Sequence, residues 1–192
     1  RLNYYLAEQH GVDTDKPNDY QAFLESYQPF HWFIEFYGII RTGGFDTLIG
    51  NPPYVTYNPK QLGYQVFDYS TTDCGDLFAL VTERAATLTN QYGYNGLIVR
   101  LSSAANPSML QFRKLLSLSA SKVWASFYSA SAQPSCLFEG VRDRLSIYIY
   151  RKSGPLREFF TTNFLKWFSR ERSPYLFNTR LNYTLNSCKD LN

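Results

Sequence analysis

The sequence feature that most constrains the fold is the stretch FDTLIGNPPY at residues 45–54. Its first half has the apolar pattern of a short, largely buried strand, carried by Phe45, Leu48 and Ile49. Gly50 and the two prolines after Asn51 end that strand abruptly, because proline donates no backbone hydrogen bond to a sheet. Asn51 and Tyr54 are therefore expected just past the carboxyl end of the strand, where open α/β sheets place their binding and catalytic residues.

The composition is that of a globular chain with one core. The chain has 192 residues, 44% of them hydrophobic, and its apolar runs are far too short to cross a membrane. No charged-then-apolar amino-terminal segment indicates secretion. The cysteines are far apart and form no CxxC pair, which argues against a zinc site or a disulfide framework: Cys74, Cys136 and Cys188. This cysteine usage favours a reducing compartment, and we expect a cytoplasmic protein.

The two histidines provide no metal or catalytic motif. His31 lies in an aromatic run and His10 lies near the end of a predicted helix, and neither has the HExxH spacing of a metal-binding helix. A structural role is the favoured interpretation for both.

Hydrophobic periodicity predicts helices first and then an alternation of strands and helices. The expected elements are helices at 2–9 and 19–28, an extended segment at 30–36, a strand at 45–49, a loop at 55–74 with at most a short helix at 61–64, a helix at 76–88, a strand at 97–99, a helix at 109–118, and strands at 122–128 and 144–150. Parallel βα units that finish in a hairpin predict an α/β fold, the later half of a doubly wound sheet with a reversed final strand.

Charge is distributed unevenly along the chain. Residues 1–150 contain 11 Lys or Arg against 13 Asp or Glu, whereas residues 151–192 contain 8 against 3. Such a basic segment is compatible with contact to phosphate, and a solvated basic face without a partner explains it equally well.

From Pro155 onward, the residue pattern changes, and we place a domain boundary between residues 154 and 155. Aromatic residues there interleave with basic ones: Arg157, Phe159, Phe160, Phe164, Lys166, Trp167, Phe168, Arg170 and Arg172. This interleaving suits a segment that stacks on bases and holds phosphate. It also suits an amphipathic helix packed on a core, which is the interpretation we favour slightly.

In its strand context, the motif NPPY within GGFDTLIGNPPYV at residues 43–55 resembles a known family. The family is that of adenine-specific DNA methyltransferases of restriction-modification systems, in particular fused enzymes of the Eco57I-like type. The chain resembles the carboxyl-terminal half of their methyltransferase core over residues 30–152. Supporting similarity lies in the aromatic run at 30–36, the helix at 76–88, the strand at 96–101 and the segment LFEGV at 137–141.

The resemblance implies a Rossmann-like methyltransferase fold and methylation of the amino group of adenine by S-adenosylmethionine. The amino lone pair is delocalised into the ring, so the enzyme must hold both N–H bonds with acceptors that favour a more tetrahedral nitrogen. By resemblance, the side-chain oxygen of Asn51 and the carbonyl oxygen of Pro52 are these acceptors. Tyr54 would stack on the adenine after it is flipped out of double-stranded DNA.

The same resemblance assigns substrate-binding roles to Pro53, which stiffens the loop, and to Phe138, as a second aromatic wall. An ordinary core role for Phe138 is almost as good an interpretation. Residues 1–154 would then be a partial S-adenosylmethionine-dependent methyltransferase domain. Residues 155–192 would be a linker or the start of a target-recognition region.

One part of the family pattern is missing from the sequence. The family holds S-adenosylmethionine chiefly with a glycine-containing turn after its first strand and an acidic residue after its second, and nothing in residues 1–42 resembles either. We therefore assign no cofactor-binding residue. We expect the chain to be a fragment, covalently continuous with a missing amino-terminal half, and to be inactive in isolation.

Other functions remain open on the sequence. RNA guanine and protein glutamine methyltransferases have similar NPPY loops, and a catalytically incomplete remnant that only binds DNA or a partner subunit is a third interpretation. The basic extension after Lys152 favours DNA. A cytosine ring-carbon methyltransferase is disfavoured, because Ser135 separates Pro134 from Cys136 and no Pro-Cys nucleophile is present.

Overall fold

A computed structural model describes residues 1–130, 137–138, 141–166 and 182–186 of the chain. By its internal contacts, the chain divides into two compact units, Arg1–Thr42 and Gly43–Asn192. Several sequence predictions lie outside the described residues: those on Pro134, Ser135, Cys136, Cys188, Trp167, Phe168, Arg170 and Arg172.

The described elements of the first unit are all helical. They are α1 (Leu2–Gln9), α2 (Pro17–Tyr27), α3 (Trp32–Glu35) and α4 (Tyr37–Arg41). The helix predicted at 2–9 is confirmed. The second predicted helix is also confirmed, but it begins at Pro17, because the first position of a helix needs no backbone N–H donor.

The extended segment predicted at 30–36 is wrong, because its centre is the short helix α3. The Glu35 amide donates a hydrogen bond to the His31 carbonyl oxygen at 3.0 Å, and the Phe36 amide donates to the Trp32 carbonyl oxygen at 3.0 Å. The Trp32 and Phe36 rings stack with centroids 5.5 Å apart. Aromatic residues four positions apart meet on one side of a helix. A run whose aromatic residues roughly alternate in the sequence can therefore form a helical turn.

Both histidines make structural contacts within this unit. The His31 ring is hydrogen-bonded through Nε2 to the side-chain oxygen of Asn3. The His10 ring packs against Phe23 and Tyr27, with centroid distances of 5.8 and 4.8 Å. These contacts support the structural role that the sequence favoured.

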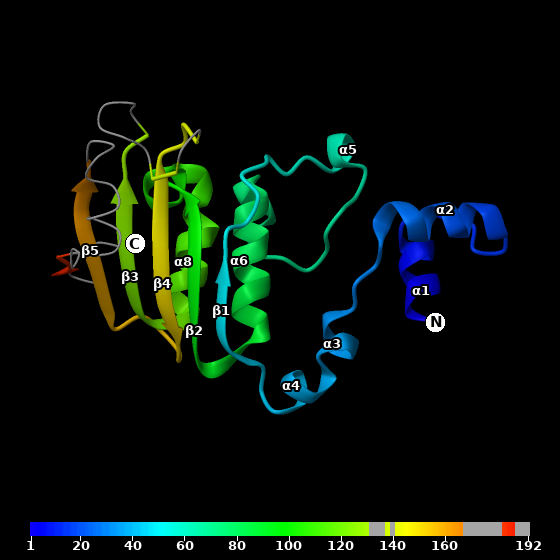
Figure 1. Cartoon of the computed structure of the whole chain (residues 1–192), viewed down its shortest axis with the longest axis horizontal. Coiled ribbons are helices and arrows are strands. Elements are labelled where there is room, and N and C mark those ends of the chain that lie inside the picture. The colour runs from blue at the N-terminus through cyan, green and yellow to red at the C-terminus, as the bar shows by residue number, and fades with distance from the viewer. Residues whose placement is uncertain (131–136, 139–140, 167–181, 187–192) are drawn as a thin grey trace. The chain divides into compact units, whose positions relative to one another are not determined.

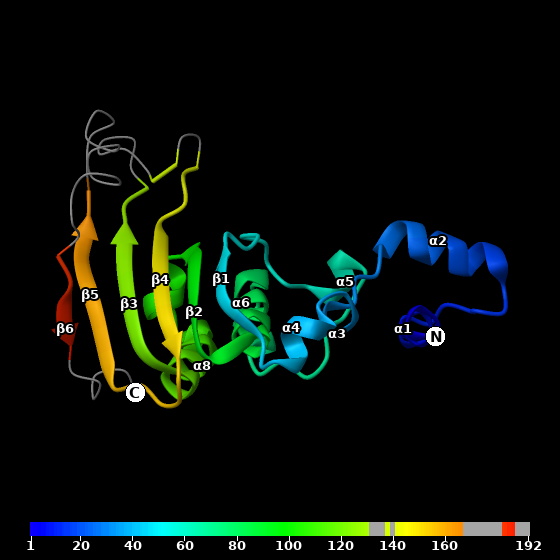
Figure 2. The same cartoon turned by 60° about the horizontal axis from the view of Figure 1, so that its bottom comes forward.

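The second unit is built on a sheet that has six strands among the described residues (Figures 1 and 2). They are β1 (Phe45–Gly50), β2 (Thr89–Arg100), β3 (Ala120–Tyr128), β4 (Leu145–Lys152), β5 (Glu158–Leu165) and β6 (Thr184–Asn186), in the spatial order β1-β2-β4-β3-β5-β6. β1 and β2 are parallel, and β4 is antiparallel to both β2 and β3. The predicted α/β sheet with a reversed hairpin strand is confirmed.

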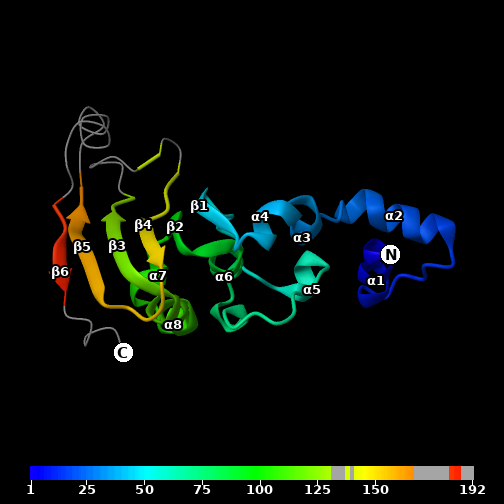
Figure 3. The same ribbon diagram turned by 90° about the horizontal axis from the view of Figure 1, so that it is seen from below.

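The helices α6 (Leu77–Leu88) and α8 (Leu110–Ser119) lie on the same face of this sheet, as Figure 3 shows. Buried side chains from both helices meet buried side chains of the strands. The Phe112 ring packs edge-on against Phe78 and Tyr148, with centroid distances of 5.8 and 5.6 Å. Shorter helical segments are α5 (Pro59–Leu62), η1 (Thr72–Cys74), α7 (Ser102–Ala105) and η2 (Pro107–Met109).

The amphipathic helix favoured after Pro155 is wrong, because residues Glu158–Leu165 form β5, which pairs with β3 and β6. The Phe160 ring stacks on Trp124 of β3 at a centroid distance of 5.9 Å. Lys122 lies over both rings and forms an ion pair with Glu158. These cross-strand contacts use the aromatic and basic residues that looked helical in the sequence. The boundary between residues 154 and 155 stays a prediction.

Within the described part of the chain, none of the helices combines the length and the apolar content needed to span a membrane.

Candidate functional site

Strand β1 lies at one edge of the described sheet, and its carboxyl end leads into the NPPY loop. Leu48 packs against the core, but no residue of β1 is fully buried and the side chain of Ile49 is 82% exposed, so the expectation of a largely buried strand is wrong. Successive side chains of a strand point to opposite faces, and α6 and α8 cover only one face of this sheet. Gly50 pairs with Leu97 of β2, which places Asn51 beside the carboxyl end of β2.

The NPPY loop presents Asn51 and Pro53 to solvent and buries Pro52. The Tyr54 hydroxyl donates a hydrogen bond of 2.6 Å to Oδ1 of Asn51 and also lies 3.3 Å from the Ile98 carbonyl oxygen. An amide oxygen has two lone pairs, so Oδ1 keeps one for a second donor. None of the described residues donates a hydrogen bond to the Pro52 carbonyl oxygen. The end of β1 therefore carries two acceptors on consecutive residues, each with a lone pair that no described residue uses.

The Tyr54 hydroxyl is a hydrogen-bond donor rather than a base. Partial burial, together with the negative charge of Asp143, raises the pKa of Tyr54 to about 12, although the nearby Arg100 cation acts to lower it. The phenol therefore stays protonated at neutral pH and keeps donating to Asn51.

Arg100, at the end of β2, connects the loop to the rest of the unit. Its guanidinium donates a 2.7 Å hydrogen bond to the Tyr54 carbonyl oxygen and lies 5.9 Å from the centre of the Tyr54 ring. It forms an ion pair of 3.2 Å with Asp76, the N-cap residue of α6, and lies 3.9 Å from a carboxylate oxygen of Asp143. Burial raises the pKa of Asp76, while Arg100 acts to lower it. Arg100 thus holds together β2, α6 and the NPPY loop.

The sequence interpretation missed Arg100, Asp76 and Asp143 as members of this site. One signal was present, because Arg100 directly follows the apolar run at 97–99 that predicts the neighbouring strand. A charged residue at the carboxyl end of a strand next to β1 is placed at the same edge as Asn51.

The loop after the NPPY motif is attached to the start of α6. The Leu77 amide donates a hydrogen bond to the Val55 carbonyl oxygen at 2.9 Å, and the Tyr57 amide donates to the Gly75 carbonyl oxygen at 3.0 Å. The short helix expected near residues 61–64 is present as α5, two residues earlier, because Asn58 caps it and Pro59 occupies its first position.

The Glu83 carboxylate of α6 holds the far end of the same loop. It accepts hydrogen bonds from the amides and hydroxyls of Ser70 and Thr71, at distances between 2.7 and 3.0 Å. Burial acts to raise the pKa of Glu83, but these four hydrogen bonds outweigh it and hold the pKa below its usual range.

A lowered carboxyl pKa in the folded state makes folding depend on pH in a defined direction. Stability from Glu83 is present above the unfolded-state pKa of 4.5 and is lost as the pH falls through the lower folded-state pKa. We expect Glu83→Gln to reduce the free energy of unfolding at pH 7 by about 1–3 kcal/mol. We also expect this free energy to fall less steeply in the variant than in wild type as the pH is lowered. Urea titrations from pH 3 to 7 measure both effects.

The control for this prediction is Asp68→Asn in the same loop. Asp68 is exposed and has a positive φ of 63°, which asparagine also tolerates. This variant is expected to keep the acid dependence of the wild-type chain. Equal acid dependence in wild type and Glu83→Gln would contradict the role given to Glu83.

The predicted substrate residue Phe138 lies in a segment that packs near Tyr54. Its neighbour Leu137 is buried in a cluster with Tyr128 and Leu145, and Tyr54 packs on that cluster. The Phe138 side chain itself is 38% exposed, which does not fit an ordinary core phenylalanine. The structure thus brings the Phe138 segment and the NPPY loop to one cluster.

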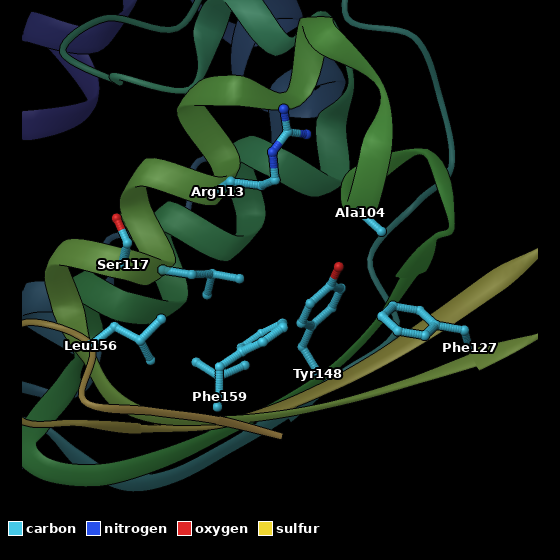
Figure 4. Close-up of a pocket in the computed structure, with 9 residues that line it drawn as sticks. Ala104, Arg113, Ser117, Phe127, Tyr148, Leu156 and Phe159 are labelled. Atoms are coloured by element: carbon cyan, nitrogen blue, oxygen red, sulfur yellow. The ribbon is translucent and has the colours of Figure 1, made fainter. Parts of the chain in front are cut away.

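A separate cavity of about 120 Å³ lies between α8 and the sheet (Figure 4). Arg113 and Ser117 come from the helix, whereas Tyr148, Phe127 and Phe159 come from the strands. No NPPY residue lines this cavity, so it is distinct from the site at β1. Elsewhere in the described residues, no group of three or more His, Cys, Asp or Glu side chains is placed to hold a metal ion, and Cys74 is a buried free thiol.

The sheet order, the reversed strand β4 and the loop after β1 define a Rossmann-like methyltransferase fold. The sequence profile described as Eco57I restriction-modification methylase matches residues 3–131. The chain belongs to the Eco57I restriction-modification methylase family.

A curated relative is a Methanocaldococcus jannaschii protein described as a candidate type II restriction enzyme and methyltransferase. It is 33% identical over 94 residues, which are 48% of this chain and 8% of that protein. The chain therefore spans less than a tenth of that relative's length.

Two solved structures show the same fold at low sequence identity. The structure of a DrdV–DNA complex matches with a TM-score of 0.58 at 13% identity, over 73% of this chain and 17% of that one. A modification subunit of a candidate type I restriction enzyme from Vibrio vulnificus matches with a TM-score of 0.55 at 11% identity, over 78% of this chain and 35% of that one.

Proposed function

We propose that this chain carries the target-base part of a DNA methyltransferase that methylates the amino group of adenine in double-stranded DNA. It would act within a larger restriction-modification enzyme, with S-adenosylmethionine as methyl donor. Family membership supports the class of enzyme, and the relatives are described as restriction and modification enzymes. The observation that supports amino-group chemistry is the pair of acceptors on consecutive residues at the end of β1, the Asn51 side chain, which keeps one lone pair beside its bond from Tyr54, and the Pro52 carbonyl.

These acceptors would raise the low reactivity of the amino nitrogen, whose lone pair is delocalised into the ring. One N–H of the amino group would donate to Oδ1 of Asn51 and the other to the Pro52 carbonyl oxygen. Both hydrogen bonds favour a nitrogen whose lone pair is directed out of the ring plane. The lone pair held in this way would form the new N–C bond with a methyl group from S-adenosylmethionine, which would leave as the neutral thioether, and the nitrogen would then lose one proton to solvent.

The loop residues hold this geometry before the base arrives. Pro52 is buried and Asn51 is fixed by the Tyr54 hydroxyl, so neither acceptor has to be ordered when the base binds. Preorganised groups matter because a misplacement of about 1 Å can cost on the order of 100-fold in rate. Tyr54, Pro53 and the exposed Phe138 would contact the flipped base, where stacking contributes about 1–3 kcal/mol per base.

S-adenosylmethionine supplies an electrophilic methyl group when it is bound. Asn51 is exposed, which fits the approach of such a methyl group to the amino nitrogen of the bound base. We assign no residue of this chain to hold the cofactor, because the described elements before β1 are helices and supply no strand followed by a glycine turn.

The proposal is tested by identifying the methylated product. The complete enzyme that contains this chain is incubated with labelled S-adenosylmethionine and unmethylated duplex DNA, and the digested nucleosides are separated by mass spectrometry. Label in N6-methyladenine supports the proposal. Label in N4-methylcytosine, or only in parallel samples of RNA or glutamine-containing peptide, would overturn it.

Two substitutions of Tyr54 separate its hydroxyl from its ring. Tyr54→Phe removes the hydrogen bond to Asn51 but keeps the stacking surface, so we expect a rate about 10-fold to 100-fold lower with little change in DNA affinity. Tyr54→Ala also removes the ring, and DNA binding should weaken by about 1–3 kcal/mol. Single-turnover rates and fluorescence anisotropy measure the two effects. Equal DNA affinity for Phe and Ala variants would exclude stacking by Tyr54.

A further inference from the structure

An open hollow of about 470 Å³ is connected to the NPPY loop through Arg100, although no NPPY residue lines it. It is formed by the end of β2 and the segment that enters β4, with lining residues Arg100, Leu101, Ser102, Arg142, Asp143 and Arg144. The backbone of the two segments is joined by a 2.8 Å hydrogen bond from the Leu101 amide to the Arg144 carbonyl oxygen. Arg100 also belongs to the acceptor site, since it holds the Tyr54 carbonyl oxygen at 2.7 Å. Arg100 is therefore common to the hollow and to the site proposed for the base.

The hollow carries two arginines whose charges are not paired with any described residue. Arg100 is paired with Asp76 and lies near Asp143, so its charge is largely balanced. Arg142 and Arg144 are exposed, and neither side chain makes a hydrogen bond or an ion pair with any described residue. Asp143 lies between them in sequence but faces Arg100 at 3.9 Å. Among the described residues, this surface thus offers two guanidinium groups without a partner.

We propose that Arg142 and Arg144 bind a backbone phosphate of the DNA strand that carries the target base. This inference rests on the proposed function, because it takes the base bound at Asn51 as its starting point. A base held by the NPPY loop leaves its sugar and phosphates at the rim of the site, and Arg100 places the hollow at that rim. Guanidinium groups are suited to phosphate because their planar N–H donors can form two parallel hydrogen bonds.

A phosphate of the DNA backbone fits the hollow better than a small anion bound by itself, which would favour a closed site. Both arginines are exposed and the hollow is open, so a continuous backbone can pass through it without a break. Phosphate contacts of this kind set the register of a strand without reading its sequence. Arg142 and Arg144 would then support base flipping by fixing the backbone beside the extruded nucleotide.

The test is the salt dependence of DNA binding by the complete enzyme that contains this chain. Affinity for a fluorescent duplex is measured by anisotropy from low to moderate salt, for wild type and for Arg142→Gln/Arg144→Gln. Loss of one neutralised phosphate is expected to reduce the slope of log K against log salt by about 1. The effect should be equal for duplexes of different sequence, because the contact is to the backbone.

The matched control is Lys114→Gln/Arg151→Gln, which removes the same charge elsewhere. Lys114 is exposed on α8, and Arg151 pairs in register with Tyr94, in the middle of β2 and six residues before Arg100. This control should keep the wild-type slope. An unchanged slope in the Arg142/Arg144 variant, an equal change in the control, or no DNA binding by wild type at low salt would each overturn the proposal.

A second probe is inorganic phosphate at matched ionic strength. Competition by phosphate that disappears in the Arg142/Arg144 variant, without a change of slope, would assign the hollow to a free anion and overturn the strand contact. The salt slope needs no methyl transfer, so the outcome is independent of the proposed function. A lowered slope with no methylated adenine in the complete enzyme would mean that the proposed function, and not the phosphate contact, has failed.

Discussion

Asn51→Ala in the complete enzyme is expected to lower the rate of methyl transfer by about 100-fold to 1,000-fold, the usual effect of losing one preorganised polar group at a reacting centre. The substitution removes the side-chain oxygen that would hold one N–H of the amino group. It also leaves the Tyr54 hydroxyl without the acceptor that it contacts at 2.6 Å. Single-turnover transfer of labelled methyl groups to duplex DNA measures the rate of the chemical step.

The matched control is Asn58→Ala, an asparagine in the same loop that lies outside the site. Asn58 caps α5 by accepting a 3.1 Å hydrogen bond from the Lys60 amide, so its loss affects local helix stability by about 1 kcal/mol. Its methyl-transfer rate should remain within a few-fold of wild type, and Asn51→Ala should keep its affinity for DNA. Near wild-type transfer by Asn51→Ala would exclude the assigned acceptor role.

The position of the acceptor loop could be predicted because its signals are local. The two prolines after Asn51 cannot donate a backbone hydrogen bond to a sheet, so the end of β1 and the placement of Asn51 followed from a few adjacent residues. The exposure of Ile49 could not be predicted in the same way. An apolar strand residue is buried only if another element covers its face, and that depends on elements far away in the sequence.

The segment after Pro155 shows the same limit for secondary structure. Its aromatic and basic residues fit a helix about as well as a strand, and local pattern cannot separate the two. The strand β5 forms because β3 offers it a parallel partner, including the Trp124 ring that stacks on Phe160. Pairing partners of this kind decide between helix and strand when intrinsic preference is weak.

The polar network of the site is also a product of tertiary structure. Arg100 meets Asp76 and the Tyr54 carbonyl oxygen across sequence separations of 24 and 46 residues. Contacts between residues so far apart in the chain cannot be recognised from a short sequence motif. The position of the NPPY loop was therefore predictable from its sequence, whereas the ion pairs that hold the loop in place became visible only in the fold.

Gly44→Ala is expected to be among the most destabilising single substitutions in the second unit, with a loss of about 4 kcal/mol or more in the free energy of unfolding. Gly44 has a φ of +110°, and an added Cβ would lie 2.4 Å from the Leu88 carbonyl oxygen and 3.0 Å from the Asn90 amide nitrogen. These are backbone atoms at the junction of α6 and β2, so no side-chain rotation can relieve the clash. Urea unfolding followed by circular dichroism measures the loss.

Gly43→Ala separates the steric clash from backbone strain. Gly43 has nearly the same φ, +112°, but its added Cβ would meet only the Asn90 Cβ at 3.9 Å. Strain alone should cost about 1–3 kcal/mol, so Gly43→Ala should unfold at clearly higher urea than Gly44→Ala. Equal destabilisation by both would mean that the turn does not pack against the α6–β2 junction. Close packing at Gly44 fixes where β1 begins, and β1 is only six residues long, so the same contact determines where Asn51 presents its acceptor.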